Sequence, residues 1–158
     1  MIVIYHGHAG AVSAAVAAAI HSGLLPEDRV PPAREILAVP EVWAVASGTP
    51  GRLVWLGRDG GDGHDIHFLA HRARFDVLER VVREVGARLG VDTSDILYVD
   101  TVPSVGWAAR SLGAAVGFLG IGRLALPALV ALTRTAYPRL ADLVRQTRAR
   151  LGQAGDRP

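Results

Sequence analysis

Short apolar runs alternate with amphipathic segments along the chain, and this alternation predicts a mixed α/β fold. Residues 2–6 (IVIYH) are β-branched and aromatic, which is typical of a strand covered on both faces. A glycine-containing turn at 7–10 separates this strand from an alanine-rich helix over 11–22. Residues 96–99 repeat the buried-strand pattern. We assign 126–132 as a third buried strand, with a helix as the open alternative.

A β-hairpin is predicted in the middle of the chain, with strands at 51–58 and 64–72. Glycine and aspartate at 59–63 tolerate the positive φ angles that hairpin turns need. Apolar residues at helical spacing predict helices over 75–89 and from 134 onward.

The order of these elements indicates how they assemble. Three strands connected through helices favour a parallel sheet with right-handed crossovers. The expected fold is therefore an α/β three-layer sandwich with a mostly parallel, Rossmann-like sheet plus an antiparallel β-hairpin. Residues 1–152 are expected to form a single domain, and 153–158 a flexible C-terminal tail.

The amino-acid composition limits the kinds of functional site and partner that the chain can have. The chain has 158 residues, half of them hydrophobic, and no cysteine, which excludes thiolate nucleophiles, disulfides and cysteine-ligated metals. All 17 basic residues are arginine, and the net charge is only +2. The basic residues are spread along the chain apart from Arg145, Arg148 and Arg150. That small cluster favours a solvated helix face, so we expect no nucleic-acid partner.

One segment, 112–133, is long and apolar enough to raise the question of membrane insertion. Arg123, Pro127 and several glycines interrupt it, and a charge in the middle of a bilayer is costly. We therefore expect no membrane insertion. The first residues lack the basic region of a signal peptide, and we expect a cytoplasmic protein.

Polar residues gather where the expected strands end. In parallel sheets, ligands bind outside the carboxyl ends of the strands. The loop after the first strand also leads into a helix N-terminus, whose free N–H groups favour an anion. These features predict a site for a phosphate-bearing or other anionic small molecule. They do not identify a cofactor. Its ligand-binding residues would be His6, Gly7, His8, Gly10, Ser13, Asp100, Thr101 and Arg134.

Two other functions stay open. His6, His8 and Asp100 could form a two-histidine, one-carboxylate centre of a metal-assisted hydrolase. Hydrogen bonding to loop backbone explains these residues more simply, so no metal site is assigned; Asp100 either caps the next helix or lines the pocket. The other alternative is a non-catalytic homo-oligomer or hetero-oligomer that associates through 113–132 or the hairpin. His64, His67 and His71 are expected to be solvated on the second hairpin strand.

Known phosphate-binding loops do not match the first loop. Gly7 and Gly10 form only a loose G-x-x-G, without the Gly-Lys-Ser/Thr of a Walker A motif or the G-x-G-x-x-G of dinucleotide sites. The strand–loop–helix order is similar to that of low-molecular-weight tyrosine phosphatases. The chain lacks their nucleophilic cysteine, since Gly7 stands at the comparable position, and Val12 or Ser13 stands where their loop arginine would be.

Several blocks in order resemble the domain of unknown function 3189 family over nearly the full length. They are YHGHAGAVSAAVAAAIHSGLLPEDRVP, EILAVP, GRLVWLG, LYVDTVPSVGWAARSLG and TRTAYP. The resemblance implies a Tyr-His pair at the end of the first strand, often followed by cysteine. Here Gly7 stands at the cysteine position and Val12 at a histidine position, while Ser13 is retained. The resemblance supports the fold and the domain boundaries and implies no activity.

Overall fold

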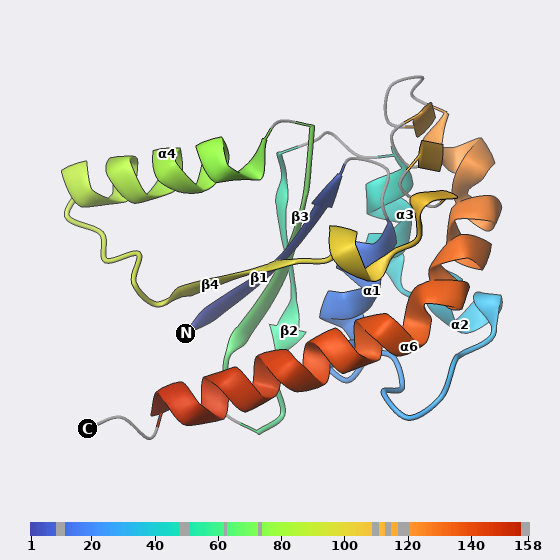
Figure 1. Ribbon diagram of the computed structural model, residues 1–158, viewed down its shortest axis with the longest axis horizontal. Helices are drawn as coiled ribbons and strands as arrows, with labels where there is room; N and C mark the ends of the chain where they lie inside the picture. The colour runs from blue at the N-terminus through green and yellow to red at the C-terminus, as the bar shows by residue number, and fades with distance from the viewer. Residues whose placement is uncertain are drawn as a thin grey trace.

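The computed structural model describes the chain except for residues 9–11, 48–50, 62, 73, 109–110, 113–114, 117–120 and 156–158 (Figure 1). The described residues form a mixed α/β fold around a four-stranded sheet. This bears out the expected class and its mostly parallel sheet. The finer expectation of a three-layer, Rossmann-like sandwich stays a prediction.

The sheet has the strand order β2-β3-β1-β4. Its strands are β1 (Ile2–His8), β2 (Leu53–Arg58), β3 (Asp65–His71) and β4 (Ile96–Asp100). β1 is parallel to both β3 and β4, and β2 pairs antiparallel with β3. The predicted hairpin is confirmed, and its second strand joins the parallel part of the sheet. The carboxyl ends of β1, β3 and β4 therefore lie at one edge.

Central position explains the composition of β1. It is buried from Val3 to Gly7, because it has a strand on each side and apolar contacts on its faces. The edge strand β2 is more exposed and contains a bulge between Trp55 and Gly57. Gly57 has a φ of +137° there, a conformation that favours glycine.

One face of the sheet carries the main core. Helix α1 (Val12–His21) is buried along its whole length and contacts β1 and β3 on one side and α6 (Gly122–Gly155) and α3 (Pro40–Ser47) on the other. Its many alanines let these neighbours approach closely. The short helix α2 (Ala33–Leu37) packs against α3 and α6. The core therefore lies between the sheet and α6, with α1 at its centre.

Helix α4 (Phe75–Arg88) is arranged differently. Figure 1 shows it standing apart from α1, α3 and α6. Within α4, only Gly86 is buried. The helix was predicted from its amphipathic spacing, but in the described part of the chain no other element packs closely along it.

Residues 126–132 belong to α6, so their assignment as a third strand is wrong. The buried α6 side chains recur every three or four residues: Leu126, Leu129, Val130, Thr133, Ala136, Tyr137 and Leu140. That is the helical period, whereas a half-buried strand would bury alternate residues. Figure 1 shows α6 changing direction along its length, and the helix contains Pro127 and Pro138, each of which removes a backbone hydrogen bond.

The end of the chain and the membrane question can be compared with the described residues. α6 runs to Gly155, and residues 156–158 of the expected tail lie outside the described residues. Leu126, Leu129 and Val130 are buried in the chain's own core, whereas Leu124 of the same segment is 86% exposed, so association through 113–132 stays a prediction. Among the described residues, every helix is too short or too polar to span a lipid bilayer.

Candidate functional site

The sheet register brings four polar residues to one edge. His8 of β1 lies opposite His71 of β3, and His6 of β1 lies opposite Asp100 of β4. Side chains alternate between faces along a strand, and residues opposite each other share a face. His6, His8, His71 and Asp100 therefore lie on the same face, which is opposite to the one that α1 covers.

These residues border a cleft of about 520 Å³ between the strand ends and the first turns of α4. Its lining consists of His6, His8, His71, Arg74, Phe75, Asp76, Glu79, Tyr98, Asp100 and Val102. Three of the eight predicted ligand-binding residues, His6, His8 and Asp100, are in this set. We call this feature the histidine cleft.

His6 is the most constrained of these side chains. Its ring stacks on Phe75, with the ring centroids 3.4 Å apart and the planes 9° from parallel. Its Nδ1 lies 3.3 Å from Nε2 of His71 and 4.0 Å from Oδ1 of Asp100. Burial lowers the pKa of His6 to about 4, against the opposing attraction of Asp100. His6 is therefore neutral at pH 7, and its contact with Asp100 is not an ion pair there.

His71 completes the imidazole pair. It is buried, and its ring lies 5.4 Å from the His6 ring and 5.5 Å from the His8 ring, measured between centroids. A hydrogen bond between His6 Nδ1 and His71 Nε2 needs a proton on one nitrogen and a lone pair on the other. The pair can thus hold one proton in either of two positions beside the cleft.

Asp100 has both of the roles considered for it. Its Oδ1 accepts a hydrogen bond from the backbone N–H of Val102 at 2.9 Å, which supports the start of the 3₁₀ helix η1 (Val102–Ser104). Its side chain is also 48% exposed and lies at the histidine cleft. The backbone contact orients the carboxylate and leaves it accessible from the cleft.

The charged residues of the histidine cleft are mainly acidic. Asp76, Glu79 and Asp100 line it, and Arg74 is the one cation among its described lining residues. Arg74 is paired with Asp76 at 2.9 Å, and Glu79 is paired with Arg83 at 2.9 Å. With Asp76 and Glu79 offset by arginines, the exposed carboxylate of Asp100 and the neutral His6 favour a neutral or cationic ligand over an anion.

Four of the other predicted residues can be placed, and none has a side chain in the histidine cleft. Ser13 and Thr101 are buried and hydrogen-bonded to each other at 3.1 Å, and Thr101 Oγ1 donates to the carbonyl of His6 at 2.9 Å. These hydrogen bonds connect α1 to the carboxyl ends of β1 and β4. Gly7 lies within β1, and Gly10 lies outside the described residues.

The position of Arg134 differs from the predicted one at a strand end. Its Nε donates to the carbonyl of Pro31 at 3.0 Å, from α6 to the segment before α2. It was expected at a strand end because 126–132 was assigned as a strand. Since that segment is helical, Arg134 is not at the carboxyl edge of the sheet.

Sequence reasoning missed His71, Arg74 and Phe75. His71 was expected to be solvated, because the hairpin was considered apart from the parallel strands. The signal that could have found it is the sequence order: His71 ends a strand and is followed within a few residues by a helix, as His6 and His8 are. A strand–turn–helix unit of this kind places its strand end at the carboxyl edge of a parallel sheet.

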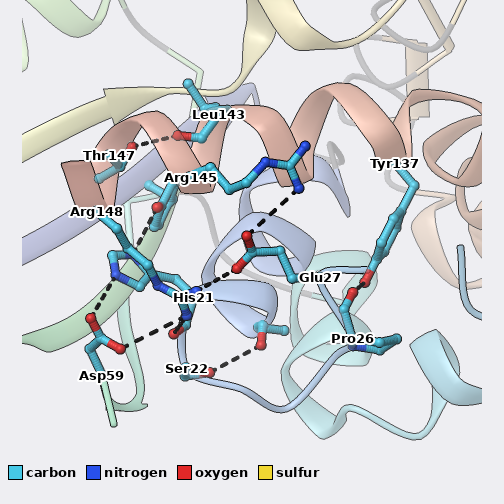
Figure 2. Close-up of polar contacts among 12 residues, drawn as sticks. His21, Ser22, Pro26, Glu27, Asp59, Tyr137, Leu143, Arg145, Thr147 and Arg148 are labelled. Atoms are coloured by element: carbon cyan, nitrogen blue, oxygen red, sulfur yellow. Dashed lines mark hydrogen bonds and ion pairs between the residues drawn. The ribbon is translucent and has the colours of Figure 1, made fainter. Parts of the chain in front are cut away.

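A second polar cluster lies on the α1 side of the sheet, and its members contact one another (Figure 2). His21 is completely buried, and its Nε2 donates to Oδ2 of Asp59 at 3.3 Å. Its Nδ1 then accepts from the Tyr5 hydroxyl at 2.8 Å. Arg148 donates to the His21 carbonyl at 2.8 Å and pairs with Glu27. We call these five residues the buried network; it joins α1, α6 and the hairpin turn.

Metal binding needs several ligands in one place. Within the described ranges, no three histidine, aspartate or glutamate side chains converge closely enough to hold a metal ion. His6, His8 and Asp100 share the cleft without forming such a set.

A comparison with protein families matches residues 2–149 to the family described as protein of unknown function (DUF3189). The chain belongs to this family. The match confirms the resemblance seen in the sequence and covers all of the sheet and the histidine cleft. No curated protein and no solved structure matches the chain.

Proposed function

We propose that the protein binds a small molecule in the histidine cleft and exchanges a proton with it through the His6–His71 pair. The observation that carries this is the 3.3 Å contact between the two imidazoles, beside Asp100, at the carboxyl ends of three parallel strands. The neutral His6 can accept a proton from a ligand, and the hydrogen-bonded pair can pass a proton between its two rings, as general acid–base chemistry requires. In Rossmann-like sheets, ligands bind at the carboxyl ends of the parallel strands, which is where this proposal places the ligand. The expectation of a cytoplasmic protein is unchanged.

The charge of the ligand follows from the same residues. The exposed carboxylate of Asp100 at the cleft supports a neutral or cationic group beside it. An anionic or phosphate-bearing ligand remains the alternative that the strand–loop–helix unit suggests. It would need protonated imidazoles, and because burial lowers the pKa of His6 to about 4, its affinity would rise as the pH falls toward 4.

Thermal unfolding with a ligand panel tests the proposal. The panel contains inorganic phosphate, nucleotides, sugar phosphates, and neutral and amine-bearing metabolites. A binder should raise the melting temperature of the wild type and not that of His71→Ala. His67→Ala is the matched control, because His67 lies on the same strand and does not line the cleft. Equal loss in both variants, or no binder at any pH, would count against the site.

A metal-assisted hydrolase is the second candidate, and one distance favours it. Two nitrogen ligands on tetrahedral zinc lie roughly 3.4 Å apart when each bond is about 2.1 Å. His6 Nδ1 and His71 Nε2 are 3.3 Å apart. A third ligand, from His8 or Asp100, would have to move closer. Zinc titration by calorimetry distinguishes the candidates: stoichiometric binding that His71→Ala abolishes and His67→Ala keeps supports the metal, and no binding excludes it.

A further inference from the structure

Helix α4 exposes a row of large apolar side chains. Val77 is 47% exposed, Val81 51%, Val85 48% and the following Leu89 73%. These residues are four apart, so they form one continuous stripe along the helix. We call it the α4 stripe. Such a stripe on one element is a mark of an interaction surface rather than of scattered surface apolar residues.

The rest of α4 shows that its own chain supports it weakly. Phe75 anchors its first turn by stacking on His6, and Gly86 is buried near its end, where a Cβ would meet Thr93. Between these points the helix has little tertiary packing in the described part of the chain. Isolated helices of this length are marginal in water, and most helical stability in proteins comes from a packed apolar face.

A row of alternating charges lies directly beside the stripe. Asp76, Arg80, Glu84 and Arg88 are also four residues apart, and their signs alternate along the helix. The order is antisymmetric about Val82: Asp76 and Arg88 are equally far from it, and so are Arg80 and Glu84. A second copy of α4 running in the opposite direction would therefore oppose each charge with its opposite. In antiparallel helix pairs, a flanking row faces its own counterpart on the partner.

We propose that α4 is a homodimer interface, in which two copies pack antiparallel through the α4 stripe about a two-fold axis near Val82. Asp76 then faces Arg88 of the partner subunit, and Arg80 faces the partner's Glu84. The exposed contact between Arg80 and Asp76 within one chain, at 3.5 Å, costs little to exchange. Because Asp76 lines the histidine cleft, the dimer also brings the partner's Arg88 to the rim of that cleft.

Charge reversal tests the pairing. Sedimentation velocity of the wild type is expected to give a concentration-dependent dimer. Arg80→Glu or Glu84→Arg alone should weaken the dimer about tenfold, because each change creates two like-charge contacts across the axis. The double variant should restore it. Arg139→Glu, an exposed charge reversal on α6, is the control and should leave the dimer unchanged.

Cross-linking tests the direction of the helices. The chain has no cysteine, so Val81→Cys and Val77→Cys each add a single thiol. In the antiparallel pair the two copies of residue 81 are about 3 Å apart along the axis and those of residue 77 about 15 Å. Mild oxidation should therefore link Val81→Cys and not Val77→Cys. Circular dichroism checks that each variant is folded.

Three outcomes would overturn the proposal. A folded wild type that stays monomeric at high concentration means that another protein covers the stripe. A dimer whose affinity does not change on charge reversal at residue 80 or 84 forms through another surface. Efficient cross-linking at residue 77 as well as 81 means a parallel pair.

Discussion

His6 and His21 are both buried, yet only His6 borders a cleft. His21 has a partner for each ring nitrogen, Tyr5 on one side and Asp59 on the other, so its hydrogen-bonding capacity is used within the fold. His6 shares its Nδ1 between His71 and the approach to Asp100. Burial lowers the pKa of both imidazoles. The difference in partners makes His21 a structural residue and His6 a candidate for chemistry.

The protonation of these residues predicts a loss of stability in acid. Both histidines have a lower pKa in the folded protein than the ordinary 6.5, so the unfolded chain takes up more protons below that pH. Stability is complete above about pH 6.5 and falls as the pH drops toward 4. The shift of His6 to about 4 corresponds to at most about 3 kcal/mol.

Urea unfolding at pH 7, 5.5 and 4.5 measures this loss. His6→Gln removes one of the two histidines whose pKa is lowered, so the free energy of unfolding should fall less steeply with acid than in the wild type. The remaining slope reports His21 together with carboxylates of lowered pKa such as Asp65 and Asp76. Identical slopes in the two proteins would show that His6 does not contribute.

At the scale of elements, local patterns predicted most of what the structure contains. The hairpin turn at 59–63 and the amphipathic spacing of α4 gave these elements nearly at their observed limits. The segment 126–132 was assigned wrongly because a short apolar run fits both a buried strand and a buried helix. Only its continuity with the helical spacing after Thr133 separates the two.

Two helix glycines should respond in opposite ways to the same substitution. In Gly86→Ala the new Cβ would meet Thr93 Cγ2 at 2.5 Å and the Val91 carbonyl at 3.3 Å, so α4 and the following loop must separate. We expect a loss of about 1–3 kcal/mol. Gly152→Ala in α6 meets nothing within 4 Å and should gain about 0.5–1 kcal/mol from helix propensity.

Denaturant midpoints of both variants check this pair. The Gly152→Ala variant is the control for the general preference of helices for alanine. Stabilisation of both proteins would mean that the loop at 91–93 adapts freely and does not hold α4 in place.

At the scale of the whole molecule, the buried network and the histidine cleft lie on different sides of the sheet and serve different purposes. The network uses Asp59 of the hairpin turn to join α1 and α6, as Figure 2 shows for His21 and Arg148. The cleft uses the free carboxyl ends of the strands. The hairpin thus contributes to both, through its turn at one end and His71 at the other.

Removal of the Asp59 carboxylate should therefore destabilise the whole fold. Asp59→Ala leaves the buried His21 Nε2 without its acceptor and removes one of the two carboxylates beside Arg148, the other being Glu27. We expect a loss of about 2–3 kcal/mol in urea unfolding. Asp95→Ala, an exposed aspartate before β4, should change stability by no more than about 0.5 kcal/mol. Similar losses in both variants would contradict the role given to the network.

Only part of the candidate site could be predicted, because local patterns show where strands end but not which strands are neighbours. His6, His8 and Asp100 could be named because each stands at the end of a locally recognisable strand. Arg134 was misplaced because its position depended on the assignment of 126–132. His71 was missed because its partner His6 is 65 positions away, and no local pattern shows which strands pair.

The sequence by itself determined the α/β class, the hairpin and the amphipathic nature of α4, since these depend on the spacing of apolar and turn residues over a few positions. Only the tertiary structure decided that β3 lies beside β1, which brings two histidines into contact and opens a cleft beside them. Strand order depends on packing between distant segments: α1 covers one face of the sheet, and α6 packs on α1. The other face was left to α4, whose apolar stripe no described segment covers.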